Sequence, residues 1–328
     1  MILAKLKLIA TATFGLEAVV KREIISLGYK IIKAEDARIT FLGDERAVCR
    51  SNLWLRCADR VLIQLGEFKA LTCEELFQQT KALPWEEWIP MDGEIIVTGS
   101  SVKSQLHSVP DCQKIVKKAI VEKLKEIYSL EWFPETGANY TVKVRLLKDE
   151  VSITLDTSGV GLHKRGYRVS DVEAPIKETL ASALVQLSFW KPGRLLVDPL
   201  CGSGTITIEA AMLGRNIAPG LSRNFAAEEW DVIPKELWKE ERKKAFEAID
   251  YDADVRIIGS DISKASIKSS KLNAIEAGVD DCIDFHVSPA SNLRAPEEYG
   301  IIITNPPYGE RIGKKDQIHK IYDAIRNF

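Results

Sequence analysis

The residues best suited to chemistry lie near the end of the chain, in Ile301-Ile-Ile-Thr-Asn-Pro-Pro-Tyr-Gly-Glu-Arg311. Two consecutive prolines after an apolar strand fix the backbone and keep Asn305 out of the helical region. The Asn305 side chain and the Pro306 carbonyl then offer two acceptors to a cleft, with no nucleophile beside them. This pair fits a planar exocyclic amine, because it holds both N–H hydrogens and turns the nitrogen lone pair toward an electrophile. Tyr308 supplies a ring that can stack on a base.

A glycine-rich loop follows another apolar strand, in Leu195-Leu-Val-Asp-Pro-Leu-Cys-Gly-Ser-Gly-Thr205. Gly202 and Gly204 let a ligand approach the backbone closely, and the helix that opens there offers unpaired N–H groups. The loop is neither the dinucleotide fingerprint G-x-G-x-x-G nor a P-loop, because no Gly-Lys-Ser/Thr follows. Asp198 suits a ligand with a positive ammonium group better than a pyrophosphate. A tight glycine turn without a ligand is the alternative interpretation.

A second acidic residue ends the strand in Ile257-Ile-Gly-Ser-Asp-Ile262. A carboxylate at this place can accept both ribose hydroxyls of an adenosine, although a plain loop aspartate has the same pattern. Asp261 follows Asp198 by 63 residues, against about 20 in the simplest nucleotide-binding units. An insertion at 214–254 accounts for the excess.

These motifs depend on elements whose periodicity divides the chain in two. The first part alternates short strands with amphipathic helices, which predicts an α+β sheet with helices on one side, followed by a second unit of the same kind. Its expected strands are 2–10, 31–34, 39–42, 61–68, 94–99, 140–147 and 150–156, and its expected helices are 15–27, 73–82 and 111–129.

Segment 157–174 lacks periodicity and is the best linker candidate. Beyond it, near-continuous apolar strands alternate with helices, which predicts a parallel, doubly wound sheet. The expected helices are 175–188, 205–213, 235–248 within the insertion, 264–277 and 317–327, and the expected strands are 194–198, 255–260, 283–287 and 300–304.

Composition narrows the class of protein only coarsely. The net charge is −2, divided into +3 over residues 1–170 and −5 over 171–328, which argues against nonspecific coating of nucleic acid but permits a local basic face. The six cysteines form no C-x-x-C pair, so we expect reduced thiols, no metal site and a cytoplasmic protein. No apolar run approaches the roughly 18 to 20 residues that span a bilayer, so we expect no membrane anchor.

The motifs together resemble a known family. Asp198-Pro-x-Cys-Gly-Ser-Gly-Thr205 with Asn305-Pro-Pro-Tyr308 is similar to the S-adenosylmethionine-dependent amino-methyltransferases. With Leu162-His-x-Arg-Gly-Tyr-Arg168, Ala174-Pro-Ile-Lys-Glu-Thr-Leu-Ala181 and Ile217-Ala-Pro-Gly-Leu-x-Arg-x-Phe225, the set resembles the THUMP-domain RNA guanine-N2 methyltransferases. The likeness is greatest to the bacterial enzymes that act on 23S rRNA, and it covers nearly the whole chain.

The resemblance implies a domain plan and a cofactor. Residues 1–64 would form a ferredoxin-like unit, 65–157 a THUMP RNA-binding domain, 158–174 the linker, and 175–328 a Rossmann-like domain that binds S-adenosylmethionine. Sheets of this family normally continue beyond the four strands visible here, so we expect a form shortened after the fourth strand, or a partner that covers the open flank.

The resemblance also assigns residues to roles. Asn305, Pro306 and Tyr308 would act on the target amine. The residues in contact with RNA would be Lys103, Ser104, Gln105, Lys114, Lys117, Lys118, Arg165 and Arg168. Taken alone, the lysines of the expected helix 111–129 are typical of a solvated helix face. The family's acidic adenine contact falls on Pro289, so Ile262 and Ala290 would serve by packing and backbone bonds. The cofactor residues would be Asp198, Cys201, Gly202, Ser203, Gly204, Thr205, Asp261, Ile262 and Ala290, with Glu178 and Thr179 closing over them.

Several other functions fit parts of the pattern. A tRNA guanine-N2 methyltransferase is the nearest alternative to an rRNA enzyme, and a noncatalytic RNA-binding assembly factor with a relict site comes from a different class. A DNA adenine-N6 methyltransferase uses the same Asn-Pro-Pro-Tyr motif, but no helix-turn-helix or other duplex reader is visible. A protein glutamine methyltransferase fits the motif but not the RNA-binding resemblance.

Overall fold

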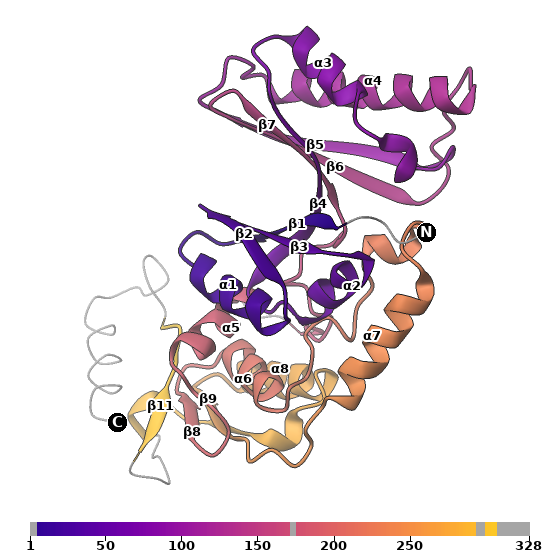
Figure 1. Ribbon diagram of the computed structural model, residues 1–328. Helices are drawn as coiled ribbons and strands as arrows, with labels where there is room; N and C mark the ends of the chain where they lie inside the picture. The colour runs from indigo at the N-terminus through magenta and orange to yellow at the C-terminus, as the bar shows by residue number, and fades with distance from the viewer. Residues whose placement is uncertain (1–4, 171–174, 293–298, 307–328) are drawn as a thin grey trace. The chain divides into compact units, whose positions relative to one another are not determined.

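The computed structural model describes residues 5–170, 175–292 and 299–306 (Figure 1). The chain divides into two compact units. The first unit comprises Met1–Asn52, Ala58–Gly161 and Asn224–Glu241, and the second comprises Leu53–Cys57, Leu162–Arg223 and Arg242–Phe328. Each unit therefore contains a segment that lies between stretches of the other in the sequence.

The first unit is built on one seven-stranded sheet with the order β2-β3-β1-β4-β7-β6-β5. Strand β4 joins two groups of strands, because it pairs with β1 along one edge and with β7 along the other. All neighbours are antiparallel except β5 and β6. The strands are β1 (Leu6–Ala12), β2 (Lys30–Glu35), β3 (Arg38–Gly43), β4 (Ala58–Lys69), β5 (Glu94–Val102), β6 (Asn139–Leu147) and β7 (Glu150–Asp156).

The helices of this unit cover one face of the sheet. They are α1 (Glu17–Ser26), α2 (Glu45–Trp54), α3 (Cys73–Lys81) and α4 (Val109–Tyr128). Alternate strand residues such as Leu8, Ile63 and Val142 are buried beneath them, which is the period of two expected of a sheet with one covered face. The opposite face is mostly polar and carries Lys143 and Arg145.

The insertion contributes to this unit through Asn224–Glu241. The Trp230 ring stacks on Tyr140 with 4.9 Å between ring centroids. Glu241 is the last residue of this segment and lies in helix α7 (Lys235–Glu247). It is buried and accepts hydrogen bonds from Arg46 at 2.7 Å and Arg50 at 2.8 Å. The insertion is thus an integral part of the first unit.

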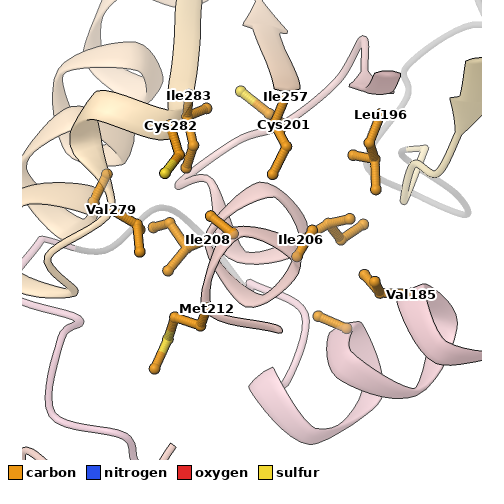
Figure 2. Close-up of a cluster of buried hydrophobic side chains, with 14 of the residues drawn as sticks. Val185, Leu196, Cys201, Ile206, Ile208, Met212, Ile257, Val279, Cys282 and Ile283 are labelled. Atoms are coloured by element: carbon orange, nitrogen blue, oxygen red, sulfur yellow. The ribbon is translucent and has the colours of Figure 1, made fainter. Parts of the chain in front are cut away.

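The second unit contains a four-stranded parallel sheet with the order β10-β9-β8-β11. Helix α6 (Thr205–Gly214) lies in its core, where Ile206, Ile208 and Met212 pack toward the strands and neighbouring helices (Figure 2). The other elements are α5 (Glu178–Leu187), β8 (Leu195–Asp198), β9 (Arg256–Asp261), α8 (Lys264–Glu276), β10 (Ile283–Val287) and β11 (Gly300–Ile302). The expected helix at 317–327 lies outside the described residues.

Candidate active site

The glycine loop lies between the end of β8 and the start of α6. Gly202 has φ +54° and Gly204 has φ +82°, both in the left-handed region that favours glycine. A Cβ atom on Gly204 would lie 2.8 Å from the Cβ atom of Ser270 in α8. The loop therefore requires glycine here for two reasons, backbone conformation and close packing against α8.

Asp198 ends β8 and is almost fully buried. Its carboxylate accepts a hydrogen bond from the Leu200 N–H at 3.1 Å. Burial raises the pKa of Asp198 to about 7, the Thr304 hydroxyl and the Leu200 N–H oppose this rise, and the charge of Asp261 adds to it. A buried carboxylate of this kind gains from a cationic partner, so Asp198 is suited to the ammonium group of an amino-acid ligand.

Asp261 ends β9, the strand next to β8 in the sheet. One of its carboxylate oxygens accepts from the Gly202 N–H at 3.1 Å and the other from the Ser263 N–H at 2.8 Å. Each oxygen keeps a lone pair for a further donor. The two backbone bonds therefore fix the orientation of the carboxylate and leave it able to accept further hydrogen bonds.

Apolar surface continues beside this carboxylate. Ile262 is 72% exposed although it is a large aliphatic residue, whereas Ala290, which follows β10, is buried. The Ser288 N–H donates to the Asp261 carbonyl at 3.0 Å, which holds the end of β10 against the end of β9. Ile262 is therefore available to pack on an adenine ring. Ala290 places only its backbone and a small side chain just after the end of β10.

Asn305 and Pro306 follow β11, on the other side of β8. The register pairs Ile302 with Val197, and the Ile303 N–H donates to the Val197 carbonyl at 3.1 Å. Asn305 is exposed just past this edge. Tyr308 lies outside the described residues. The carboxyl ends of β9, β8 and β11 thus bring Asp261, Asp198 and Asn305 to one edge of the sheet, where open α/β sheets bind ligands.

Arg168 is bound to the glycine loop, which differs from its expected role as an RNA contact. Its guanidinium donates to Ser203 at 3.1 Å and to Thr205 at 3.1 Å. It also forms an ion pair with the buried Glu178 at 2.8 Å. The hydroxyls of Ser203 and Thr205 and the carboxylate of Glu178 are therefore held by one cation. Arg168 is a positioning residue for the loop.

Asn273 of α8 completes this arrangement, and the sequence did not predict its role. Its side-chain oxygen accepts from the Val169 and Ser170 N–H groups at 3.0 Å, and its amide donates to the Ser203 carbonyl at 3.2 Å. An isolated asparagine in a helix gives no sequence signal for such a role. Residues 168–170 are thereby tied to both the glycine loop and α8.

The prediction that Arg165 contacts RNA is wrong. Arg165 is 3% exposed, and its guanidinium pairs with the fully buried Glu209 of α6 at 3.3 Å. The Tyr167 hydroxyl donates to the same carboxylate at 3.1 Å. The Ser182 hydroxyl of α5 also donates to it. The polar segment read as a linker therefore contains a buried network that fixes α5 and α6, because a buried charge is stable only when paired and hydrogen-bonded.

The other proposed cofactor residues occupy internal positions. Cys201 is buried and burial raises the pKa of its thiol well above the usual value, which leaves it unreactive at neutral pH. Its N–H donates to the Ser260 carbonyl at 2.8 Å, so it links the loop to β9. Thr179 is fully buried in the first turn of α5. Cys201 therefore supports the loop through its backbone, and the Thr179 hydroxyl is buried without a hydrogen-bond partner among the described residues.

The expected RNA contacts of the first unit are exposed but partly neutralised. Ser104 and Gln105 fold onto the β6–β7 turn, where the Asp149 N–H donates to Ser104 at 3.0 Å and the Gln105 N–H donates to Asp149 at 2.7 Å. Lys103, directly after β5, has φ +51°. On α4, each of three lysines has an acidic partner: Lys114 with Asp111 at 4.0 Å, Lys117 with Glu135 at 2.8 Å and Lys118 with Glu122 at 3.7 Å.

Metal-binding clusters and membrane-spanning helices are both absent from the part of the chain that the structure describes. Within it, no group of three or more His, Cys, Asp or Glu side chains could hold a metal ion. No helix in the described ranges is long and apolar enough to cross a membrane.

Comparisons with protein families match three parts of the chain. Residues 165–328 match the family described as RMKL-like, methyltransferase domain, residues 7–62 the RlmL ferredoxin-like domain, and residues 70–156 the THUMP domain. The chain therefore belongs to the RMKL-like family of S-adenosylmethionine-dependent RNA methyltransferases.

Individual proteins agree with this assignment. The chain is 52% identical over 98% of its length to "Putative RNA methyltransferase YpsC" of Bacillus subtilis, of which it covers 84%. It is also 35% identical over 95% of its length to "Ribosomal RNA large subunit methyltransferase K/L" of Psychromonas ingrahamii. It spans 42% of that longer protein.

Solved structures share the whole arrangement. A crystal structure named as a predicted N6-adenine-specific DNA methylase from Listeria monocytogenes has a TM-score of 0.94 at 50% identity, with 98% of this chain and 84% of that chain covered. SMU.472, named as a putative methyltransferase complexed with SAH, has a TM-score of 0.92 at 42% identity, with 98% and 85% covered.

Proposed function

We propose that this protein transfers a methyl group from S-adenosylmethionine to the exocyclic N2 of a guanine in RNA, with 23S rRNA as the substrate. The observation that supports the proposal is the edge formed by β9, β8 and β11, where Asn305 follows β11 and the carboxylates of Asp198 and Asp261 end the neighbouring strands. The THUMP match and the relative named for ribosomal RNA support RNA as the substrate.

The cofactor residues fit S-adenosylmethionine by their chemistry. Asp198 offers a carboxylate for the ammonium group, Asp261 accepts from ribose, and Gly202 and Gly204 leave room beside the backbone. When bound, the cofactor supplies a methyl group already activated by its sulfonium charge. The protein consequently needs no strong base, and its task is to bind, orient and shield the reacting amine.

Asn305 and Pro306 perform the orienting step in this proposal. The Asn305 amide oxygen and the Pro306 carbonyl each accept one N–H of the guanine amine, so the nitrogen lone pair faces the methyl group. In this step the amine nitrogen would bond to the methyl carbon as the carbon–sulfur bond breaks, S-adenosylhomocysteine would leave, and the proton of the methylated amine would pass to water. The base must leave its stack to reach this edge, which costs a few kcal/mol, and stacking on Tyr308 offsets part of that cost at about 1–3 kcal/mol.

Mapping of modified nucleosides tests the substrate. We expect 23S rRNA from cells lacking this protein to lose one N2-methylguanosine, and its tRNA to remain unchanged. Loss of the same modification from tRNA alone would favour the tRNA guanine-N2 alternative. Methyl groups missing from adenine N6, as the name of the Listeria structure suggests for that protein, would refute the guanine assignment.

A further inference from the structure

The uncovered face of the seven-stranded sheet contains two hollows with volumes of about 270 and 410 Å³. Both are lined by Arg38 of β3 and Arg145 of β6. These two residues come from opposite halves of the sheet, because β1, β4 and β7 lie between their strands. The two hollows therefore share one basic site, formed by Arg38 and Arg145, at the middle of the polar face.

Ser152 of β7 connects the two arginines in the sheet. The Arg38 side chain extends across β1 and β4, and its Nη2 donates to the hydroxyl of Ser152 in β7 at 3.1 Å. The strand register places Arg145 directly opposite Ser152. Ser152 is itself buried. The site therefore presents guanidinium and hydroxyl donors, the combination that binds phosphate oxygens.

Neither arginine forms an ion pair with a carboxylate among the described residues. The Nε of Arg38 is buried without a hydrogen-bond partner, and the Arg145 side chain makes no hydrogen bond or ion pair to any residue that the structure describes. Burial lowers the pKa of Arg38, and the charge of Arg145 lowers it further. Three carboxylates, those of Glu35, Glu67 and Glu150, also line the smaller hollow, and Glu35 pairs there with Lys33 at 2.8 Å. A bound anion would relieve this repulsion between like charges.

The surroundings favour a long polyanion over a small one. Lys7 and Lys148 line the same hollow as the arginine pair, and Lys143 and Thr98 line the adjoining one. Cations and hydroxyls are thus spread along an open sheet face rather than enclosed around a single ligand. Lys143 pairs with Asp156 at 3.6 Å, as Lys114, Lys117 and Lys118 of α4 pair with their own carboxylates. The arginine pair differs, because neither guanidinium forms an ion pair with a described carboxylate.

We propose that Arg38 and Arg145 bind a backbone phosphate of the RNA substrate on this open sheet face, with Ser152 as an additional donor. The inference rests on the proposed action on RNA and deepens it by naming the surface that holds the strand. It shifts the main RNA contact from the lysines of α4 to the sheet. Contact through phosphate would position the RNA without reading its sequence.

Equilibrium binding of RNA by the full chain tests this site. The probes are 23S rRNA and a labelled single-stranded oligoribonucleotide, measured in a salt series for Arg145→Gln, Arg38→Gln and the unaltered protein. Arg145→Gln should weaken binding about 10-fold, as loss of a charge-assisted contact does, and should reduce the salt slope by about 0.7 to 0.9. Arg145 has no partner within the described fold, so this variant should remain folded even if Arg38→Gln does not.

Two controls establish whether a loss of affinity belongs to the arginine pair. Lys21→Gln removes an exposed charge from α1, on the covered side of the sheet, and should leave RNA affinity unchanged. Affinity for S-adenosylhomocysteine, measured by calorimetry, should be equal in all variants. Unchanged RNA affinity in folded Arg145→Gln would overturn the proposal. Because binding is measured without methyl transfer, this result is independent of which base is methylated.

Discussion

At the scale of single residues, the proposed contact of Asp198 with the cofactor depends on the charge state of this carboxyl group. Its carboxyl is buried and its pKa is raised to about 7, whereas Asp261 is fixed by two backbone N–H groups. A group whose pKa is higher in the folded than in the unfolded chain lowers stability as pH rises between the two values. Without cofactor, the ionisation of Asp198 therefore costs stability between about pH 4 and pH 7.

Cofactor affinity should rise as the pH rises and Asp198 ionises, whereas stability without cofactor falls. Binding of an ammonium group requires the charged form of Asp198, so the dissociation constant of S-adenosylhomocysteine should increase up to about tenfold as the pH falls from 7 to 6. Calorimetry at several pH values measures this. Asp198→Asn is the matched control and should bind weakly without this pH dependence. An unaltered protein whose affinity is the same at both pH values would remove Asp198 from the ammonium site.

Substitution of Asn305 should affect methyl transfer and leave cofactor binding nearly unchanged. Asn305→Ala removes one of the two acceptors for the amine and should lower the rate of methyl transfer about 100-fold or more, in the range of losing one preorganised hydrogen-bonding group. Affinity for S-adenosylhomocysteine should stay within about twofold. Asn305→Asp offers a matched variant of the same size. Transfer by Asn305→Ala at the unaltered rate would show that the amine is oriented elsewhere.

At the scale of elements, residues 168–170 form a brace for the glycine loop. Arg168 joins Ser203, Thr205 and Glu178, and Asn273 joins Ser170 to Ser203. A loop with two left-handed glycines needs such support to keep one conformation. The brace thus supplies rigidity to the cofactor loop from a segment without regular secondary structure.

Removal of this brace should weaken cofactor binding and leave RNA binding unchanged. We expect Arg168→Gln to weaken S-adenosylhomocysteine binding about 10- to 100-fold, because Glu178 loses its charge partner and the loop loses two hydrogen bonds. Arg168→Lys should be intermediate, since it keeps the charge but not the planar fork. RNA affinity should be unchanged. Weaker RNA binding with normal cofactor binding would instead restore Arg168 as an RNA contact.

The sequence predicted elements well where apolar periodicity was strong. Strand 150–156 and strand 283–287 match β7 and β10, and the glycine loop, Asp198 and Asp261 lie at strand ends as expected. Helix α2 was missed. The single sheet was not foreseen either, because strand pairing depends on β4, whose bulge between Gln64 and Gly66 leaves no signal in its apolar pattern. The RNA contact predicted for Arg165 was wrong, because a charged residue in a Gly-rich segment looks solvated until its buried partner, here Glu209, is known.

At the scale of the whole molecule, the insertion makes the first unit discontinuous in sequence. Its residues Asn224–Glu241 belong to the first unit, although they lie between elements of the second. Glu241 is the anchor, because it is 1% exposed and binds both Arg46 and Arg50. The first unit cannot therefore be treated as residues 1–161 alone.

Glu241 should accordingly contribute to stability. We expect Glu241→Ala to reduce the free energy of unfolding by about 1–3 kcal/mol, less than for a fully buried pair because the two arginines are partly exposed. Urea unfolding measures the change. Glu240→Ala is the control, since Glu240 is exposed and its pair with Arg46 should contribute at most about 1 kcal/mol. Equal effects of the two substitutions would show that the insertion is not anchored at Glu241.

Methyl transfer to guanine N2 in 23S rRNA, at the edge formed by β9, β8 and β11, can be measured directly. The purified chain is incubated with S-adenosylmethionine carrying a labelled methyl group and 23S rRNA from cells lacking this protein, and the labelled nucleoside is then identified. We predict N2-methylguanosine at one site, absent with Asn305→Ala. Label in N6-methyladenosine, or label that persists in Asn305→Ala, would contradict the proposed function.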